Sequence, residues 1–259
     1  MRESLSSPNT VLITGAARRI GRAIALDFAA QGWHVALHCH NSMADAEALA
    51  REIASSGSTA QVLKADLSDQ AAVEALIPQC AAQIGAPTCL INNASMFLYD
   101  GLPDLDSQQW DEQIAVNLKA PVFLAQSFAR HLPPEAVGNI INILDQRVLK
   151  PTPHFFSYAV AKSALWSATQ TLAQALAPRI RVNAIGPGPV LASPHQLPGQ
   201  FERQSAATLL QRSTSPSEIA AAIRFILDAP AMTGQMIALD GGQHLAWQTP
   251  DVLATAGKG

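Results

Sequence analysis

The chain has 259 residues, of which 48% are apolar, and its formal net charge at pH 7 is −3. This length suits one α/β domain of ordinary size, so we predict a single domain over residues 1–259. The nearly balanced charge, without a basic block, argues against a nucleic-acid partner. A polar N-terminus and the lack of a long apolar stretch predict a cytoplasmic protein without a signal peptide or membrane span. Cys39, Cys80 and Cys89 have no metal-ligand spacing, and we expect buried, reduced thiols.

Seven β-rich runs alternate with helix-like segments along the chain. The runs span 11–15, 34–39, 60–66, 89–95, 139–145, 179–186 and 235–242. The first six are almost continuously apolar, as is typical of parallel strands that helices cover on both faces. Segment 20–32 has helical periodicity and stops at Gly32. The alternation predicts a Rossmann-like, doubly wound α/β fold with a parallel sheet of about seven strands.

The first run ends in a glycine-containing turn, TGAARRIG at 14–21, that opens directly into a helix. Backbone N–H groups and the helix N-terminus bind a pyrophosphate in this position. We expect Gly15 to form the tight turn and Gly21 to allow close packing of helix on strand. The spacing is not GxGxxG, so the prediction depends on the strand-turn-helix context. A helix start with incidental glycines is the alternative.

The end of the second run indicates which dinucleotide fits. An acid there would bind the ribose hydroxyls of NAD and repel the 2′-phosphate of NADP. Residues 38–42 read HCHNS instead, and the first acid is Asp45. Arg18 and Arg19 lie in the neighbouring glycine turn, where a guanidinium can pair with phosphate. These observations favour NADP(H). The two histidines of this run lack further ligands for zinc, and solvated strand-end histidines are the alternative.

A second polar group gathers around the fifth run. Tyr158 and Lys162 lie four residues apart in a long helical pattern and so share one face. A nearby ammonium favours a phenolate, so we expect it to lower the tyrosine pKa and make Tyr158 an acid–base group. Asp145, expected as the last residue of the fifth strand, lies thirteen residues earlier, at the edge where such sheets bind ligands. Asn117 adds a polar group to an otherwise apolar helix.

These motifs together resemble the short-chain dehydrogenase/reductase family over almost the whole chain. The resemblance is specific because the order and spacing match as well. It is carried by TGAARRIG, Asp66-Leu67, Asn92-Asn93-Ala94, Asn117, the YxxxK of 158–162, Gly186-Pro187-Gly188 and the LDGG of 239–242.

The resemblance implies an NADP(H)-dependent oxidoreductase without a metal, commonly a homotetramer through the helices that carry Asn117 and Tyr158. Tyr158 would donate a proton, Lys162 would hold the nicotinamide ribose, and Asn117 would hold a water that relays protons. The implied cofactor-binding residues are Gly15, Arg18, Arg19, Ile20, Gly21, His38, His40, Asn41, Ser42, Asp66, Leu67, Asn93, Ala94, Ser95, Tyr158, Lys162, Pro187 and Gly188.

Two departures from the common family pattern point to one branch. Arg19 replaces the usual third loop glycine and Asp145 the usual catalytic serine, as in the pteridine and dihydromonapterin reductases. Asn41 stands where protozoan pteridine reductases carry an arginine, which leaves more of the 2′-phosphate charge to Arg18. The implied substrate residues are Arg19, Ser95, Phe97, Asp145 and Tyr158.

Two of these residues keep alternative interpretations. Phe97 would stack a pterin on the nicotinamide, or it is a core aromatic. Asp145 would accept hydrogen bonds from the pterin edge, relay protons if burial raises its pKa, or only cap a strand-end turn.

Three functions are consistent with this pattern. The first is NADPH-dependent reduction of a pterin such as dihydromonapterin or dihydrobiopterin, with dihydrofolate as a further candidate. The second is a carbonyl reductase acting on 3-oxoacyl thioesters, quinones or sugars, and the third a non-catalytic NADPH sensor. We expect residues 187–212 to form the substrate loop and residues 248–259 a flexible tail.

Overall fold

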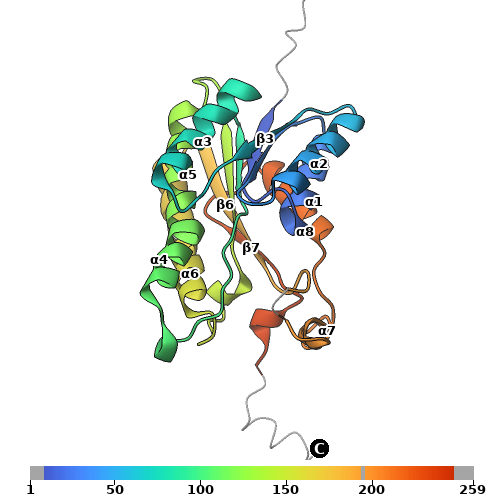
Figure 1. Cartoon of the computed structure of the whole chain (residues 1–259), viewed down its shortest axis with the longest axis vertical. Helices are drawn as coiled ribbons and strands as arrows, with labels where there is room; N and C mark the ends of the chain where they lie inside the picture. Colours follow the sequence, from blue (N-terminus) through green and yellow to red (C-terminus); the bar gives the residue numbers. More distant parts are fainter. Residues whose placement is uncertain (1–8, 194–195, 248–259) are drawn as a thin grey trace, which may run out of the picture.

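The computed structural model describes residues 9–193 and 196–247 of the chain. Seven strands form one parallel sheet in the order β3-β2-β1-β4-β5-β6-β7 (Figure 1). The predicted Rossmann-like parallel sheet is therefore confirmed. The strands are β1 Thr10–Ile13, β2 His34–Cys39, β3 Ala60–Lys64, β4 Cys89–Asn92, β5 Gly138–Ile143, β6 Ile180–Pro187 and β7 Met236–Leu239.

Helices cover both faces of the sheet (Figure 1). Helices α1, α2 and α8 lie on one face, and α3 to α6 on the other. They are α1 Arg19–Ala30, α2 Met43–Ser55, α3 Gln70–Gln83, α4 Ser107–Ile114, α5 Ala120–His131, α6 Phe156–Leu176, α7 Gln200–Ala206 and α8 Pro216–Leu227. None of the helices within the described ranges is long and apolar enough to cross a bilayer.

The core consists of two apolar layers on either side of the sheet. Successive residues of one strand belong to opposite layers: Ile13 packs with Phe28 of α1, and Leu12 with Phe128 of α5. All four side chains are at most 1% exposed. Burial on both faces explains the continuous apolar runs of the central strands. The three cysteines are also buried, and none forms a disulfide.

Five of the seven strands end earlier than their apolar runs predict, whereas β2 ends as predicted and β6 ends one residue later. β1 stops at Ile13, β4 at Asn92 and β5 at Ile143, so Asp145 lies two residues beyond its strand. Its prediction as the last strand residue is wrong, because pairing between β5 and β6 stops at Ile143. The residues beyond these ends form loops at the carboxyl edge. The strand order reverses between β1 and β4: β2 and β3 lie on one side of β1, and β4 to β7 on the other. Open α/β sheets bind ligands at such a reversal.

Other boundaries differ locally from the predictions. Helix α1 begins at Arg19 and ends at Ala30, and Gly32 follows with φ +78°. The predicted loop 187–212 contains helix α7. The predicted tail 248–259 lies outside the described residues.

Helix α6, which carries Tyr158, receives its N-terminal cap from a distant loop. Its own N-cap residue, Phe155, has φ +56° and provides no side-chain cap. The buried carboxylate of Asp100 instead accepts hydrogen bonds from the Ser157 N–H and hydroxyl. A carboxylate accepts hydrogen bonds from the free N–H groups at a helix start and interacts favourably with the helix dipole there. Asp100 therefore fixes where the first turn of α6 lies.

Candidate active site

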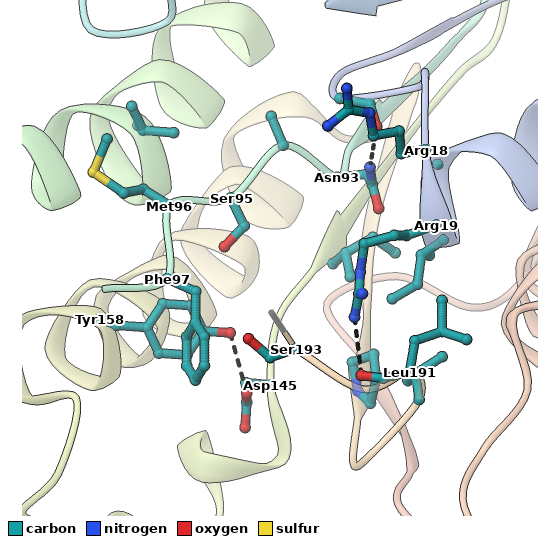
Figure 2. Close-up of a pocket in the computed structure, with 18 of the residues that line it drawn as sticks. Arg18, Arg19, Asn93, Ser95, Met96, Phe97, Asp145, Tyr158, Leu191 and Ser193 are labelled. Carbon is teal, nitrogen blue, oxygen red and sulfur yellow. Dashed lines mark hydrogen bonds between the residues drawn. The ribbon is translucent and has the colours of Figure 1, made fainter. Parts of the chain in front are cut away.

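A cavity of about 1120 Å³ opens at the carboxyl ends of the strands. Its wall contains every site residue predicted from the sequence except Asn117. Figure 2 shows Arg18 and Arg19 on one side and Phe97, Asp145 and Tyr158 on the other. The fold thus brings together groups that are far apart in the sequence, since Arg18 and Gly188 share this wall.

The glycine turn leaves no space for a side chain at Gly15 or Gly21. Gly15 has φ +61°, and a Cβ there would lie 2.9 Å from the Ala94 Cα. A Cβ on Gly21 would lie 2.3 Å from the Gly15 carbonyl oxygen. The Asn93 amide also donates to the Thr14 and Gly15 carbonyls, at 2.9 and 3.0 Å. The loop is therefore a bare backbone cradle of the kind that binds phosphates.

His38 anchors this cradle from below. The ring is 2% exposed; its Nδ1 accepts from the Gly15 N–H at 3.1 Å, and its Nε2 lies 3.2 Å from the Ala65 carbonyl. These contacts require a neutral ring with the proton on Nε2. Burial lowers the pKa of His38 to about 4, which keeps the ring neutral. The alternative of a solvated strand-end histidine is wrong for His38.

The two arginines of the turn contact different segments. Arg18 is exposed and bonds Asp45 of α2, with Nη2 to Oδ2 at 2.5 Å. Arg19 donates to the carbonyls of Leu191 and Ala192, at 2.9 and 2.7 Å, and so spans from the turn to the loop after β6 (Figure 2). Its φ of +53° is the left-handed conformation that favours glycine. This explains why glycine is usual here and marks Arg19 as a residue retained despite strain.

The far end of the cavity is polar and exposed. His40 Nε2 lies 3.6 Å from Asp66 Oδ2, while Asn41 is exposed and Leu67 buried. Hydrogen bonds from the Ser68 N–H and hydroxyl lower the pKa of Asp66, which favours its carboxylate. Within the described ranges, no group of three histidines, cysteines or acids is placed to hold a metal ion.

Tyr158 and Lys162 lie in the first two turns of α6 and are 6% and 2% exposed. Burial and the Asp145 charge raise the pKa of Tyr158 well above its ordinary value. The prediction that the lysine lowers this pKa is wrong for this state, because Lys162 Nζ lies 5.7 Å from the phenol ring and donates to the Ile143 carbonyl. Burial lowers the pKa of Lys162 to about 8. Tyr158 is thus a neutral phenol at neutral pH and can give up a proton.

Asp145 Oδ2 accepts a hydrogen bond from the Tyr158 hydroxyl at 3.1 Å (Figure 2). It also caps the short helical turn Gln146–Val148, because Oδ1 accepts from the Arg147 N–H at 2.8 Å. The strand-end capping role is therefore present beside the contact with the tyrosine, so the two interpretations do not exclude each other.

Two residues of the site escaped the sequence analysis. Phe155 stacks on Phe97 with ring centroids 4.2 Å apart, and Arg147 lies over both rings. Phe97 also meets Tyr158 edge to face at 4.7 Å. Phe97 is partly exposed and lines the cavity, so it is not a closed core aromatic. The position of Arg147, two residues after Asp145, was the only sequence signal for its role.

Asn117 supports the site from outside the cavity. It is fully buried in a π-helical turn, Ala115–Lys119, between α4 and α5. Its Oδ1 accepts from the Ser95 hydroxyl at 2.9 Å and the Met96 N–H at 3.1 Å, and its Nδ2 donates to the Met96 carbonyl. Asn117 therefore fixes the loop that carries Ser95 and Phe97. Its role in holding a water stays a prediction.

Comparisons with known proteins agree with this architecture. A family model described as enoyl-(acyl carrier protein) reductase matches residues 15–244. The 3-oxoacyl-[acyl-carrier-protein] reductase FabG of Staphylococcus aureus (strain Mu50) is 31% identical over 241 residues, which cover 91% of this chain and 98% of that protein.

Two solved structures are more similar. One is FolM alternative dihydrofolate reductase 1 from Brucella suis in complex with NADP, at 51% identity and a TM-score of 0.91, covering 94% of this chain and 98% of the other. The Brucella canis FolM structure, also with NADP, has 50% identity and a TM-score of 0.89 over 94% and 97%. This chain belongs to the short-chain dehydrogenase/reductase family of oxidoreductases.

Proposed function

We propose that this protein is an NADPH-dependent reductase of pterins. The observation that carries the proposal is the hydrogen bond from the Tyr158 hydroxyl to the Asp145 carboxylate, in a cavity that Phe97 lines. The NADP-bound FolM structures, at about half identity, support the same assignment. A cytoplasmic location, expected from the composition, and a homotetramer, expected from the family resemblance, remain predictions.

The lining of the cavity suits a dinucleotide. Its glycine turn presents bare backbone to a pyrophosphate, and Arg18 offers a cation where the second strand has no acid. Asp66 and Leu67 would line the adenine end, and Pro187 and Gly188 the nicotinamide end. Bound NADPH would supply a hydride to the substrate ring.

The chain's own residues would position the substrate and deliver the proton. Phe97 offers a face on which a flat bicycle can stack, and Asp145 an acceptor for its amino and ring N–H groups. Tyr158, held neutral by its raised pKa, would give its proton to the reduced ring. Lys162, buried beneath the tyrosine, would hold the nicotinamide ribose.

The cofactor preference can be tested through Arg18. Replacing Arg18 by glutamine should raise the KM for NADPH by about ten- to a hundredfold and that for NADH little, because one charged phosphate contact is lost. Arg22→Gln is the matched control: Arg22 of α1 makes a similar exposed ion pair with Glu52 of α2 but does not line the cavity. Equal kcat/KM for NADPH and NADH in the native protein would contradict the preference.

The substrate is tested by NADPH oxidation with a dihydropterin and with an acetoacetyl thioester. We expect efficient reduction of dihydromonapterin or dihydrobiopterin and poor reduction of the thioester, because a site built around polar partners rejects molecules that leave them unpaired. The FabG relative favours the thioester as the competing substrate. Turnover of the thioester alone would assign a carbonyl reductase, and turnover of neither across a panel of pterins, thioesters and sugars would favour the sensor.

A further inference from the structure

Three hydrogen bonds converge on the Asp145 carboxylate. The Arg147 N–H donates to Oδ1, and both the Arg147 guanidinium and the Tyr158 hydroxyl donate to Oδ2, at 2.8 and 3.1 Å. An ionised carboxylate accepts hydrogen bonds and cannot donate them. In all three contacts Asp145 is therefore the hydrogen-bond acceptor, and in none of them does it donate a proton.

Arg147 is largely withdrawn from water for this contact. Its side chain is 18% exposed, and its Cζ lies 5.5 Å from the Phe97 ring centroid and 5.4 Å from that of Phe155. Its buried Nε has no hydrogen-bond partner among the described residues. A guanidinium tolerates aromatic faces better than an ammonium because it is planar and weakly hydrated. Its counter-charge in this environment is Asp145.

Asp145 and Arg147 also determine the electrostatic environment of the Tyr158 hydroxyl. The negative charge of Asp145 opposes formation of a phenolate, whereas Arg147 favours it. Lys162 is the other ionisable group of α6 coupled to Asp145. Arg147 thus offsets the carboxylate's penalty at the moment when Tyr158 releases its proton.

We propose that Arg147 is a positioning residue that holds the Asp145 carboxylate in its orientation as a hydrogen-bond acceptor, so that the site selects substrates presenting N–H donors. The inference rests on the proposed function, since a dihydropterin carries an amino group and ring N–H groups. It resolves the role of Asp145: the carboxylate reads the substrate edge, and Tyr158 alone supplies the proton. A carbonyl substrate without such donors would meet an acceptor facing its own oxygen.

The test is a double-mutant cycle. It compares the native protein with Arg147→Met, Asp145→Asn and the double variant, and Arg147→Lys serves as the conservative variant. The kcat/KM for a dihydropterin is measured with saturating NADPH. Arg147→Met should lower it about ten- to a hundredfold. Arg147→Lys should recover part of this loss, because an ammonium can still donate a hydrogen bond to the Asp145 carboxylate.

In the Asp145→Asn background, Arg147→Met should change kcat/KM by no more than about twofold, because the partner it acts through is gone. A purely structural role, through stacking on Phe97 and Phe155, predicts the same loss in both backgrounds. That result would overturn the proposal.

Urea unfolding of the same four proteins, native, single and double, gives an answer that needs no substrate. The double variant should unfold at a higher urea concentration than Arg147→Met alone, since Arg147→Met leaves a partly buried carboxylate without its counter-charge. A double variant no more stable than Arg147→Met would overturn the coupling of Arg147 to Asp145. If the native enzyme reduces only the thioester, the proposed function and the N–H selection fail together, while this cycle still decides whether Arg147 acts through Asp145.

Discussion

Replacing Tyr158 by phenylalanine should reduce turnover by about 10²- to 10⁴-fold, the usual contribution of general acid catalysis. The variant removes the phenolic proton and leaves the ring, its edge-to-face contact with Phe97 and the helix unchanged. Asp145 keeps both hydrogen bonds from Arg147, so the fold should be retained. Stopped-flow measurement of NADPH oxidation, with NADPH affinity from fluorescence titration, checks the loss and its origin.

Tyr99→Phe provides the control for this experiment. The chain has two tyrosines, and Tyr99 is 65% exposed with its hydroxyl 3.3 Å from His154 Nδ1. Its variant should keep native turnover. If Tyr158→Phe retained about half of the native activity, with NADPH binding intact, the proton would have to come from another group.

The second large effect is expected at Gly21. An alanine Cβ there would lie 2.3 Å from the Gly15 carbonyl oxygen and 2.7 Å from Asn93 Nδ2, and the nearest atom belongs to backbone that cannot swing aside. Overpacking of this kind costs about 1–3 kcal/mol. The displaced turn would no longer present its N–H groups to a pyrophosphate. We therefore expect NADPH affinity to fall by about a hundredfold, or about 2.7 kcal/mol.

Gly57→Ala separates this collision from the general effect of losing a glycine. Gly57 has φ +86° and open space around a Cβ. Alanine there should therefore lower the stability only by the cost of the left-handed backbone conformation, about 1–2 kcal/mol. Thermal unfolding and NADPH titration of both variants give the comparison. Native NADPH affinity in a folded Gly21→Ala protein would show that the turn does not contact the cofactor.

The sequence by itself determined the parallel sheet, the alternation of strands and helices, and the place of the site. Continuous apolar runs alternating with helical periodicity specify a sheet covered on both faces, because burial depends on patterns within each segment. The turn after β1 and the spacing of Tyr158 and Lys162 are equally local, since residues four apart share a helix face. The predicted strand ends were less accurate, because an apolar run does not show at which residue the pairing with a neighbouring strand stops.

Only the tertiary structure decided which partners these side chains have. Asp100 caps α6 from a loop 57 residues away, and Arg18 pairs with Asp45 across 27 residues. His38 turns inward to the Gly15 N–H, so it supports the turn from beneath. Arg147 pairs with Asp145 while its guanidinium lies over the rings of Phe97 and Phe155, and this arrangement depends on the packing of separate loops. Such contacts depend on how chain-distant segments pack and on how much water they exclude, and neither quantity is encoded in local periodicity or spacing.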